Sequence, residues 1–184
     1  MTTSIARDEL IAAIPSLRAF AISLCGRTDQ ADDLVQDTLV KAWGNFGSYT
    51  PGTNLRAWLF TILRNSFYSQ LRKRRREVED VDGVHAGALS VEASQSEHIR
   101  MREFRSALGL LPEDQREALI LVGAAGYSYE ETAEICGCAV GTIKSRVNRA
   151  RRKLASLLDE EVEDVATVER APLQLESLAA AAFR

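Results

Sequence analysis

The sequence predicts an all-α protein of two small helical domains joined by a flexible linker. Apolar residues recur at three- and four-residue spacing along most of the chain, which is the helical period, and strand-like alternation is hard to find. This pattern lapses over residues 77–97, where the composition becomes acidic. A length of 184 residues suits one domain or two small ones, and 46% hydrophobic residues suffice for packed cores.

Charge divides the chain in the same way. The formal net charge of -3 argues against nucleic-acid binding when it is taken alone. Residues 7–76, however, carry 11 Lys or Arg against 6 Asp or Glu, and residues 98–158 carry 10 against 7. The segments 77–97 and 159–184 are acidic. We therefore predict domains at 1–76 and 98–158, separated by an acidic linker and followed by an acidic and apolar C-terminal tail.

The first domain opens with an apolar helical face, formed by Ile11, Ile14, Leu17, Ala21 and Leu24. Pro15 interrupts this run and predicts the start of a second helix, because proline suits a first helical turn. Asp29 is expected to cap a helix that reaches about Trp43. After a loop rich in Gly, Ser and Thr, Asn54 is expected to cap a helix that ends in the basic run 72–76.

The second domain contains the most informative pattern in the chain. Pro112 is expected to begin a helix that Gly126 ends. Ser128 should cap the next helix together with Glu131, in a capping box. Gly137 then supplies a turn before a further helix begins near Val140. A short helix, a glycine turn and a second helix form the helix-turn-helix plan.

The helix after this turn separates its residues by face. Its buried stripe is predicted to contain Ile143, Val147, Ala150 and Leu154. Its polar residues are the candidates for contact with DNA bases and phosphates, and they are Thr142, Lys144, Ser145, Arg146, Arg149 and Lys153. Arginine can make two hydrogen bonds to a guanine edge, and short hydroxyl side chains allow a close approach to the groove. A solvated basic face on a structural helix is the alternative.

Other classes of function find little support in the sequence. Cys136 and Cys138 lie two residues apart without a nearby His, so we predict no metal site. The segment 123–126 is too short for a phosphate-binding loop, and no set of carboxylates has a plausible base and nucleophile beside it. We therefore expect no enzyme, no cofactor and no small-molecule ligand. Three cysteines, no apolar run of membrane-spanning length and no secretory leader point to the cytoplasm.

Both halves resemble the extracytoplasmic-function sigma factors, which are minimal relatives of sigma-70. Residues 32–43 and 55–65 resemble region 2, and residues 111–116, 128–131 and 140–146 resemble region 4. The resemblance implies a sigma factor that binds core RNA polymerase and directs initiation at promoters with -10 and -35 elements. It assigns the -35 element to the candidate residues of the helix-turn-helix.

The resemblance also implies roles in the first domain. The residues expected to bind core polymerase are Asp33, Gln36, Asp37, Leu39 and Val40. The residues expected to bind the -10 element are Tyr49, Arg64, Asn65, Phe67, Tyr68, Arg72 and Lys73. An aromatic side chain can stack on an extruded base, whereas Arg72 and Lys73 suit phosphates. A core position for Phe67 or Tyr68 is the alternative.

A narrower resemblance rests on residues 10–21 and on the type of linker. These resemble the EcfG-type general stress response sigma factors, which a NepR-type anti-sigma factor holds and a PhyR-type mimic releases. The competing hypothesis is a stand-alone helix-turn-helix regulator that binds operator DNA. Such a regulator usually dimerises to span two half-sites, and no dimerisation heptad is evident in the sequence.

Overall fold

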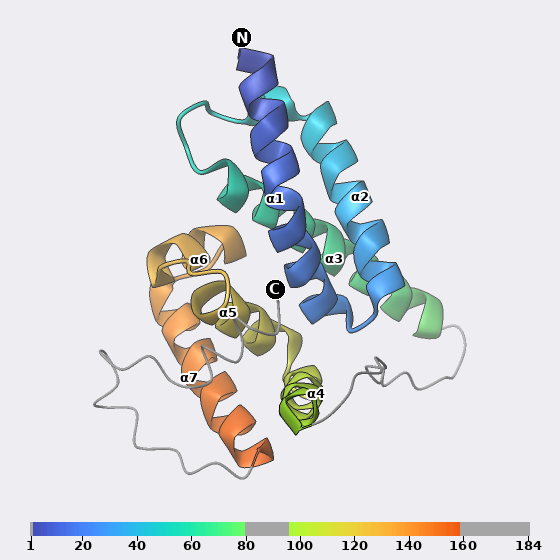
Figure 1. The fold of residues 1–184 in the computed structure, drawn as a ribbon, viewed down its shortest axis with the longest axis vertical. Coiled ribbons are helices and arrows are strands. Elements are labelled where there is room, and N and C mark those ends of the chain that lie inside the picture. The colour runs from blue at the N-terminus through green and yellow to red at the C-terminus, as the bar shows by residue number, and fades with distance from the viewer. Residues whose placement is uncertain (1, 80–95, 159–184) are drawn as a thin grey trace. The chain divides into compact units, whose positions relative to one another are not determined.

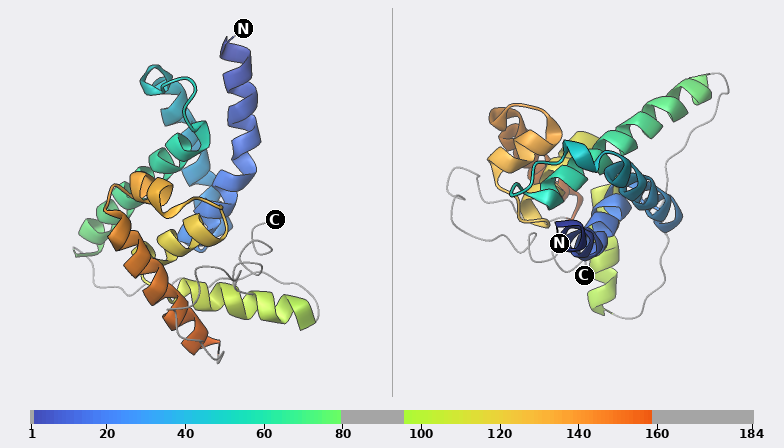
Figure 2. Two further views of the ribbon diagram at one scale, coloured as in Figure 1. Left: turned by 90° about the vertical axis from the view of Figure 1, so that its left-hand side faces the viewer. Right: turned by 90° about the horizontal axis from the view of Figure 1, so that it is seen from above.

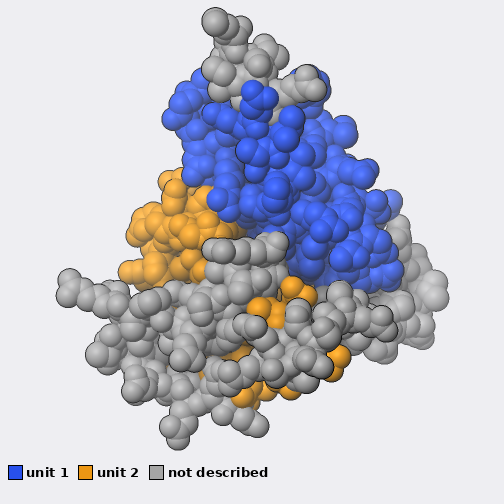
Figure 3. Space-filling model, in the orientation of Figure 1, with its two compact units in different colours: residues 1–87 blue, residues 88–184 orange. Residues whose placement is uncertain are grey.

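The computed structural model describes residues 2–79 and 96–158. These residues form seven α-helices and one short 3-10 helix, and no strand occurs among them, as the sequence predicts. The chain divides into two compact units, residues 1–87 and 88–184 (Figures 1 and 3). Most of the expected acidic linker and the C-terminal tail lie outside the described residues.

The first unit contains three α-helices and one turn of 3-10 helix. These are α1 (Thr2–Cys25), α2 (Thr28–Gly44), η1 (Phe46–Ser48) and α3 (Leu55–Glu79). Each α-helix packs against the other two (Figures 1 and 2). The rings of Phe20 on α1 and Phe60 on α3 stack with their centroids 4.9 Å apart. Leu17, Leu34 and Leu59 bring one fully buried side chain from each α-helix into the same core.

The helix α1 corrects the prediction for Pro15, because α1 continues through this residue without a break. A proline inside a helix removes one backbone hydrogen bond and costs about 3 kcal/mol. Packing on both sides offsets this cost, since Ala13 and Leu17 are buried on either side of the proline. The Ser16 hydroxyl also donates a hydrogen bond to the Ala13 carbonyl over 2.8 Å. Tertiary burial therefore outweighs the local signal for a helix start.

Two further helix ends in this unit differ from the prediction. The N-cap of α2 is Arg27, whereas Asp29 lies in the first turn. There Asp29 accepts hydrogen bonds from Arg27, which lowers the pKa of the Asp29 carboxyl. The helix α3 continues beyond the basic run to Glu79, since no glycine or proline follows closely enough to end it. The cap at Asn54 is confirmed, because its Oδ1 accepts from the Ala57 backbone N–H over 3.0 Å.

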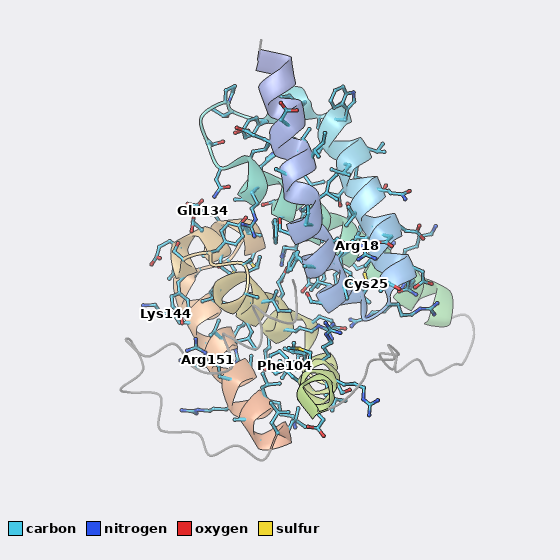
Figure 4. The ribbon with its side chains drawn as sticks, in the orientation of Figure 1. Arg18, Cys25, Phe104, Glu134, Lys144 and Arg151 are labelled. Atoms are coloured by element: carbon cyan, nitrogen blue, oxygen red, sulfur yellow. The ribbon has the colours of Figure 1, made fainter. Side chains whose placement is uncertain are left out.

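The second unit contains four α-helices. These are α4 (Ser96–Gly109), α5 (Glu113–Gly123), α6 (Tyr129–Cys136) and α7 (Val140–Leu157). The helix α7 packs against the other three. Phe104 of α4 (Figure 4) and Leu121 of α5 are buried like the inward side chains of α7 and complete this core. Packing on three sides leaves α7 one outward face.

The end of α5 also differs from the prediction, since the helix stops at Gly123 rather than Gly126. Gly126 has a φ of +75° and lies in the connection that follows. The backbone N–H groups of Ala125 and Tyr127 donate to the last carbonyls of α5, over 2.9 and 3.0 Å. The glycine therefore shapes the turn into α6 and does not end the helix itself.

Candidate nucleic-acid interface and polymerase-docking face

Local hydrogen bonds fix both ends of the short helix α6, as the sequence predicts. Ser128 Oγ accepts from the Glu131 N–H over 3.1 Å, and the Glu131 carboxylate accepts from the Ser128 N–H over 2.9 Å. At the other end Gly137 has a φ of +63°, and the Cys138 N–H donates to the Ala133 carbonyl over 3.0 Å. This is a Schellman ending, which directs the chain sharply into α7.

The helix α7 separates its two faces as the sequence predicts. Ile143, Val147, Ala150 and Leu154 are all fully buried. The exposed members of the predicted set are Lys144, Ser145, Arg149 and Lys153, while Thr142 and Arg146 are half-buried. The core therefore fixes the orientation of α7, and a basic, hydroxyl-bearing face points outward.

Side chains on this outward face contact one another. Arg149 donates from Nε to the Ser145 carbonyl and from Nη2 to Ser145 Oγ, both over 3.2 Å. Ser145 Oγ in turn donates to the Thr142 carbonyl over 2.9 Å. Lys144 lies over the ring of Tyr129 on α6, with Nζ 5.9 Å from the ring centroid. Lys144 and Arg151 share one side of α7 (Figure 4). The exposed face of α7 is therefore basic, and Lys144 connects it to the aromatic ring at the start of α6.

Arg146 differs from its neighbours on α7. Its Nε lies 3.0 Å from Asp114 Oδ2 on α5, and its Nη1 contacts Cys138 Sγ at 3.8 Å. Sequence reasoning missed Asp114, because α5 and α7 are far apart in the chain and no local spacing relates them.

In the first unit, the loop that carries Tyr49 is ordered by aromatic packing. The Tyr49 ring lies 5.6 Å from the Phe46 ring and 5.5 Å from the Trp58 ring. Its hydroxyl donates to the Thr53 carbonyl over 2.7 Å. Phe46 and Trp58 were not among the predicted site residues. The position of Trp58 one turn after the Asn54 cap could have indicated that it packs back onto the loop.

The predicted -10 residues of α3 separate into buried and exposed positions. Asn65, Arg72 and Lys73 are exposed, and the seven-residue spacing places Arg72 about two turns beyond Asn65 on the same side of α3. The Arg64 guanidinium lies over the half-buried Tyr68 ring, 4.8 Å from its centroid. Phe67 is buried at 8% exposure, which favours the core alternative for this residue.

The predicted polymerase-docking residues lie along one side of α2. Asp33 and Gln36 are exposed, Asp37 and Leu39 are half-buried, and Val40 is 71% exposed. Trp43, three residues further on, is 62% exposed although it is a large apolar side chain. Sequence reasoning did not select Trp43, yet its spacing from Val40 extends the same face by one turn. We call Asp33, Gln36, Val40 and Trp43 the α2 face.

The described residues offer neither a cluster of metal ligands nor a membrane-spanning helix. Within residues 2–79 and 96–158, no three His, Cys, Asp or Glu side chains gather as a metal ion requires. None of the helices in these ranges combines the length and apolarity needed to cross a membrane.

A helix-turn-helix unit with an outward basic face, in a chain with a second helical unit, defines a DNA-binding protein of the helix-turn-helix class. The patterns of two sigma-70 families match the chain: Sigma-70 region 2 over residues 10–77 and Sigma-70 region 4 over residues 101–154. The chain belongs to the extracytoplasmic-function sigma factors of the sigma-70 family, and it is therefore an RNA polymerase sigma factor.

Relatives that differ in their sequence identity to this chain support this assignment. The ECF RNA polymerase sigma factor EcfG of Rhodopseudomonas palustris is 66% identical over 83% of this chain and 84% of its own length. The RNA polymerase sigma factor CnrH of Cupriavidus metallidurans is 32% identical over 83% of this chain and 84% of its own. The sigma factor RpoE of Bartonella quintana, solved in complex with the anti-sigma factor NepR, matches with a TM-score of 0.77. That match has 54% identity and covers 89% of this chain and 98% of the other.

Proposed function

We propose that this sigma factor reads the -35 element with the outward face of α7. The buried stripe of α7 is the observation that carries the proposal. Because Ile143, Val147, Ala150 and Leu154 are fully buried, the core fixes which side of the helix meets DNA. On that side Ser145 and Arg149 suit base edges, whereas basic residues further along suit phosphates.

We propose that the loop around Tyr49 and the exposed side of α3 bind the -10 element. The aromatic packing with Phe46 and Trp58 supports this role, since it orders the loop before DNA arrives. Asn65 on α3 offers both donors and acceptors to a base, and Arg72 and Lys73 offer charge to the backbone. The buried Phe67 is left out of this contact set, and Tyr68, stacked with Arg64, is kept.

We propose that the α2 face binds core polymerase. It combines the polar side chains Asp33 and Gln36 with the exposed apolar side chains Val40 and Trp43. Large apolar side chains that are exposed beside polar ones mark a protein-binding surface. Leu39 and Asp37 flank this surface and are half-buried in the free chain.

We further propose control by a NepR-type anti-sigma factor within a cytoplasmic general stress response. The 54% identity to a sigma factor solved in complex with NepR supports this regulation. In this role the chain contributes specificity and no catalytic group, because the polymerase carries out the chemistry.

Run-off transcription with purified core polymerase tests the proposal. We expect initiation that depends on this chain, at start sites that are found by sequencing the transcripts from a genomic template library. A stand-alone operator-binding regulator would give no initiation from core enzyme. Addition of a NepR-type protein should abolish the transcripts.

Two variants test which unit binds the -35 element and which binds core polymerase. Arg149→Ala should weaken binding to duplexes with an intact -35 element and leave core binding unchanged. Asp33→Ala combined with Gln36→Ala should weaken core binding, measured by co-migration with core polymerase, and leave the far-ultraviolet circular dichroism unchanged. If the two effects were exchanged, the assignment of the two units would be wrong.

A further inference from the structure

Arg146 lies at the border between the buried and the outward face of α7. A helix turns by about 100° per residue. Viewed down the axis of α7, Arg146 therefore lies roughly 60° from Ile143. Arg149 lies roughly 120° from Ile143 in the same direction. Ile143 is fully buried, and Arg149 is exposed. Within one turn the same residue type therefore occupies two different environments.

The side chain of Arg146 is directed to α5. Only 20% of it is exposed, and its Nε is held 3.0 Å from Asp114 Oδ2. Its Nη1 contacts Cys138 Sγ, in the turn between α6 and α7, at 3.8 Å. One guanidinium thus joins α7 to the first turn of α5 and to the turn of the helix-turn-helix. Asp114 lies in the first turn of α5, where the helix dipole favours a negatively charged side chain.

We propose that Arg146 is a positioning residue that fixes the orientation of α7 through Asp114, and that it makes no contact with DNA. The inference rests on the proposed function of α7 in reading the -35 element. It changes the role of one residue in that set, because a guanidinium that is four-fifths buried and directed to α5 presents little of its surface to a phosphate or a base. Asp114 then acts in promoter recognition through Arg146.

Asp114→Asn distinguishes the two roles by the sign of its effect. If Arg146 contacts DNA, removing the nearby negative charge leaves binding unchanged or strengthens it, because the guanidinium is released toward the phosphates. If Arg146 positions α7, the same substitution weakens binding. A partly exposed ion pair contributes up to about 1 kcal/mol, which corresponds to a loss of about fivefold at most. Arg146→Ala should show a loss of the same size.

The measurement uses the full chain assembled with core polymerase. Its ligand is a fluorescent promoter duplex, taken from the run-off library, and the same duplex with a scrambled -35 element. The ratio of the two affinities isolates the contribution of α7. The double variant Asp114→Asn with Arg146→Ala should bind no more weakly than Arg146→Ala alone, because both changes remove one interaction.

Two control variants complete the experiment. Glu134→Gln removes an exposed negative charge from α6 and should leave the ratio unchanged or raise it slightly. Lys153→Ala removes one of the basic residues proposed for phosphates and should reduce the salt dependence of the affinity, with a change in the log–log slope of up to about 1, whereas Arg146→Ala should leave the slope unchanged. Circular dichroism checks that each variant is folded.

The possible results distinguish the positioning role of Arg146 from the proposed function of α7. Tighter or unchanged binding by Asp114→Asn, or a reduced salt slope for Arg146→Ala, would overturn the positioning role. A wild-type holoenzyme that ignores the -35 element would instead overturn the proposed function of α7.

Discussion

Lys41 on α2 donates a hydrogen bond from Nζ to Ser66 Oγ on α3 over 3.0 Å. The same ammonium group donates to Asp37 Oδ2 over 2.7 Å. Ser66 is buried at 4% exposure and directly follows Asn65, the residue proposed to read the -10 element. Lys41 therefore links the helix that carries the α2 face to the helix proposed to contact the promoter.

Replacing Lys41 with Met should destabilise the first unit by about 1 kcal/mol, because a buried hydroxyl and a carboxylate each lose a charged donor. Urea denaturation measures this loss. Ser66→Ala removes the same link from the other side, and a double-mutant cycle should give a coupling of about 0.5–1 kcal/mol. Strictly additive effects of the two substitutions would mean that the hydrogen bond contributes nothing.

The ion pair between Arg18 and Asp32 should make the stability of the folded chain depend on pH. Arg18 donates two hydrogen bonds to the Asp32 carboxylate, over 2.6 and 3.2 Å. These bonds, with charge attraction in support, lower the pKa of Asp32 below its ordinary value of 3.8. The pair therefore stabilises the folded chain above that ordinary value, and its contribution is lost as the pH falls through the lowered pKa. Arg18→Ala should raise the pKa of Asp32 in an NMR titration, and an unchanged pKa would show that the pair does not form in solution.

Ser128→Ala should remove half of the capping box and destabilise the second unit by about 1 kcal/mol. Ser156→Ala is the matched control, since the Ser156 hydroxyl only donates to the Lys153 carbonyl one turn back on an exposed side of α7. Thermal unfolding should separate the two variants, with a lower midpoint for Ser128→Ala alone. Equal midpoints would contradict a stabilising role for the cap.

Gly137 and Gly141 form a second matched pair. Both have open space where a Cβ would lie, so backbone conformation alone decides the effect of alanine. Gly137 has a φ of +63°, and alanine there should cost about 1 kcal/mol. Gly141 lies inside α7 without a positive φ, and alanine there should stabilise by up to about 1 kcal/mol. Opposite shifts of the unfolding midpoint are expected, and shifts of the same sign would refute this explanation.

Much of the architecture was predictable because its causes are local. The capping box at Ser128, the left-handed Gly137 and the buried stripe of α7 each depend on residues within one or two turns of one another. The helix-turn-helix can therefore be predicted from the sequence. Pro15 shows where local signals fail, because packing against α2 and α3 carries α1 through a residue that usually begins or breaks a helix.

The candidate site residues also divide into those that local spacing could identify and those that depend on packing between helices. Spacing along α7 identified the exposed Arg149, since a periodic pattern separates buried from outward positions, whereas the exposed Asn65 was expected from the family resemblance. Spacing could not separate Phe67 from Tyr68, because neighbouring residues near the edge of a buried face differ only in what the other helices cover. It also missed Trp58, whose partners Phe46 and Tyr49 lie in the preceding loop.

The sequence by itself determined the two helical domains and the helix-turn-helix, because these depend on period, caps and glycine turns, and its motifs carried the resemblance to the sigma-factor family. Only the tertiary structure decided which arginines of α7 face outward. Arg146 and Arg149 are three residues apart and chemically identical, and only Asp114, from another helix, makes them different. Such a contact is set by how helices pack, and packing joins residues that no spacing along the chain relates.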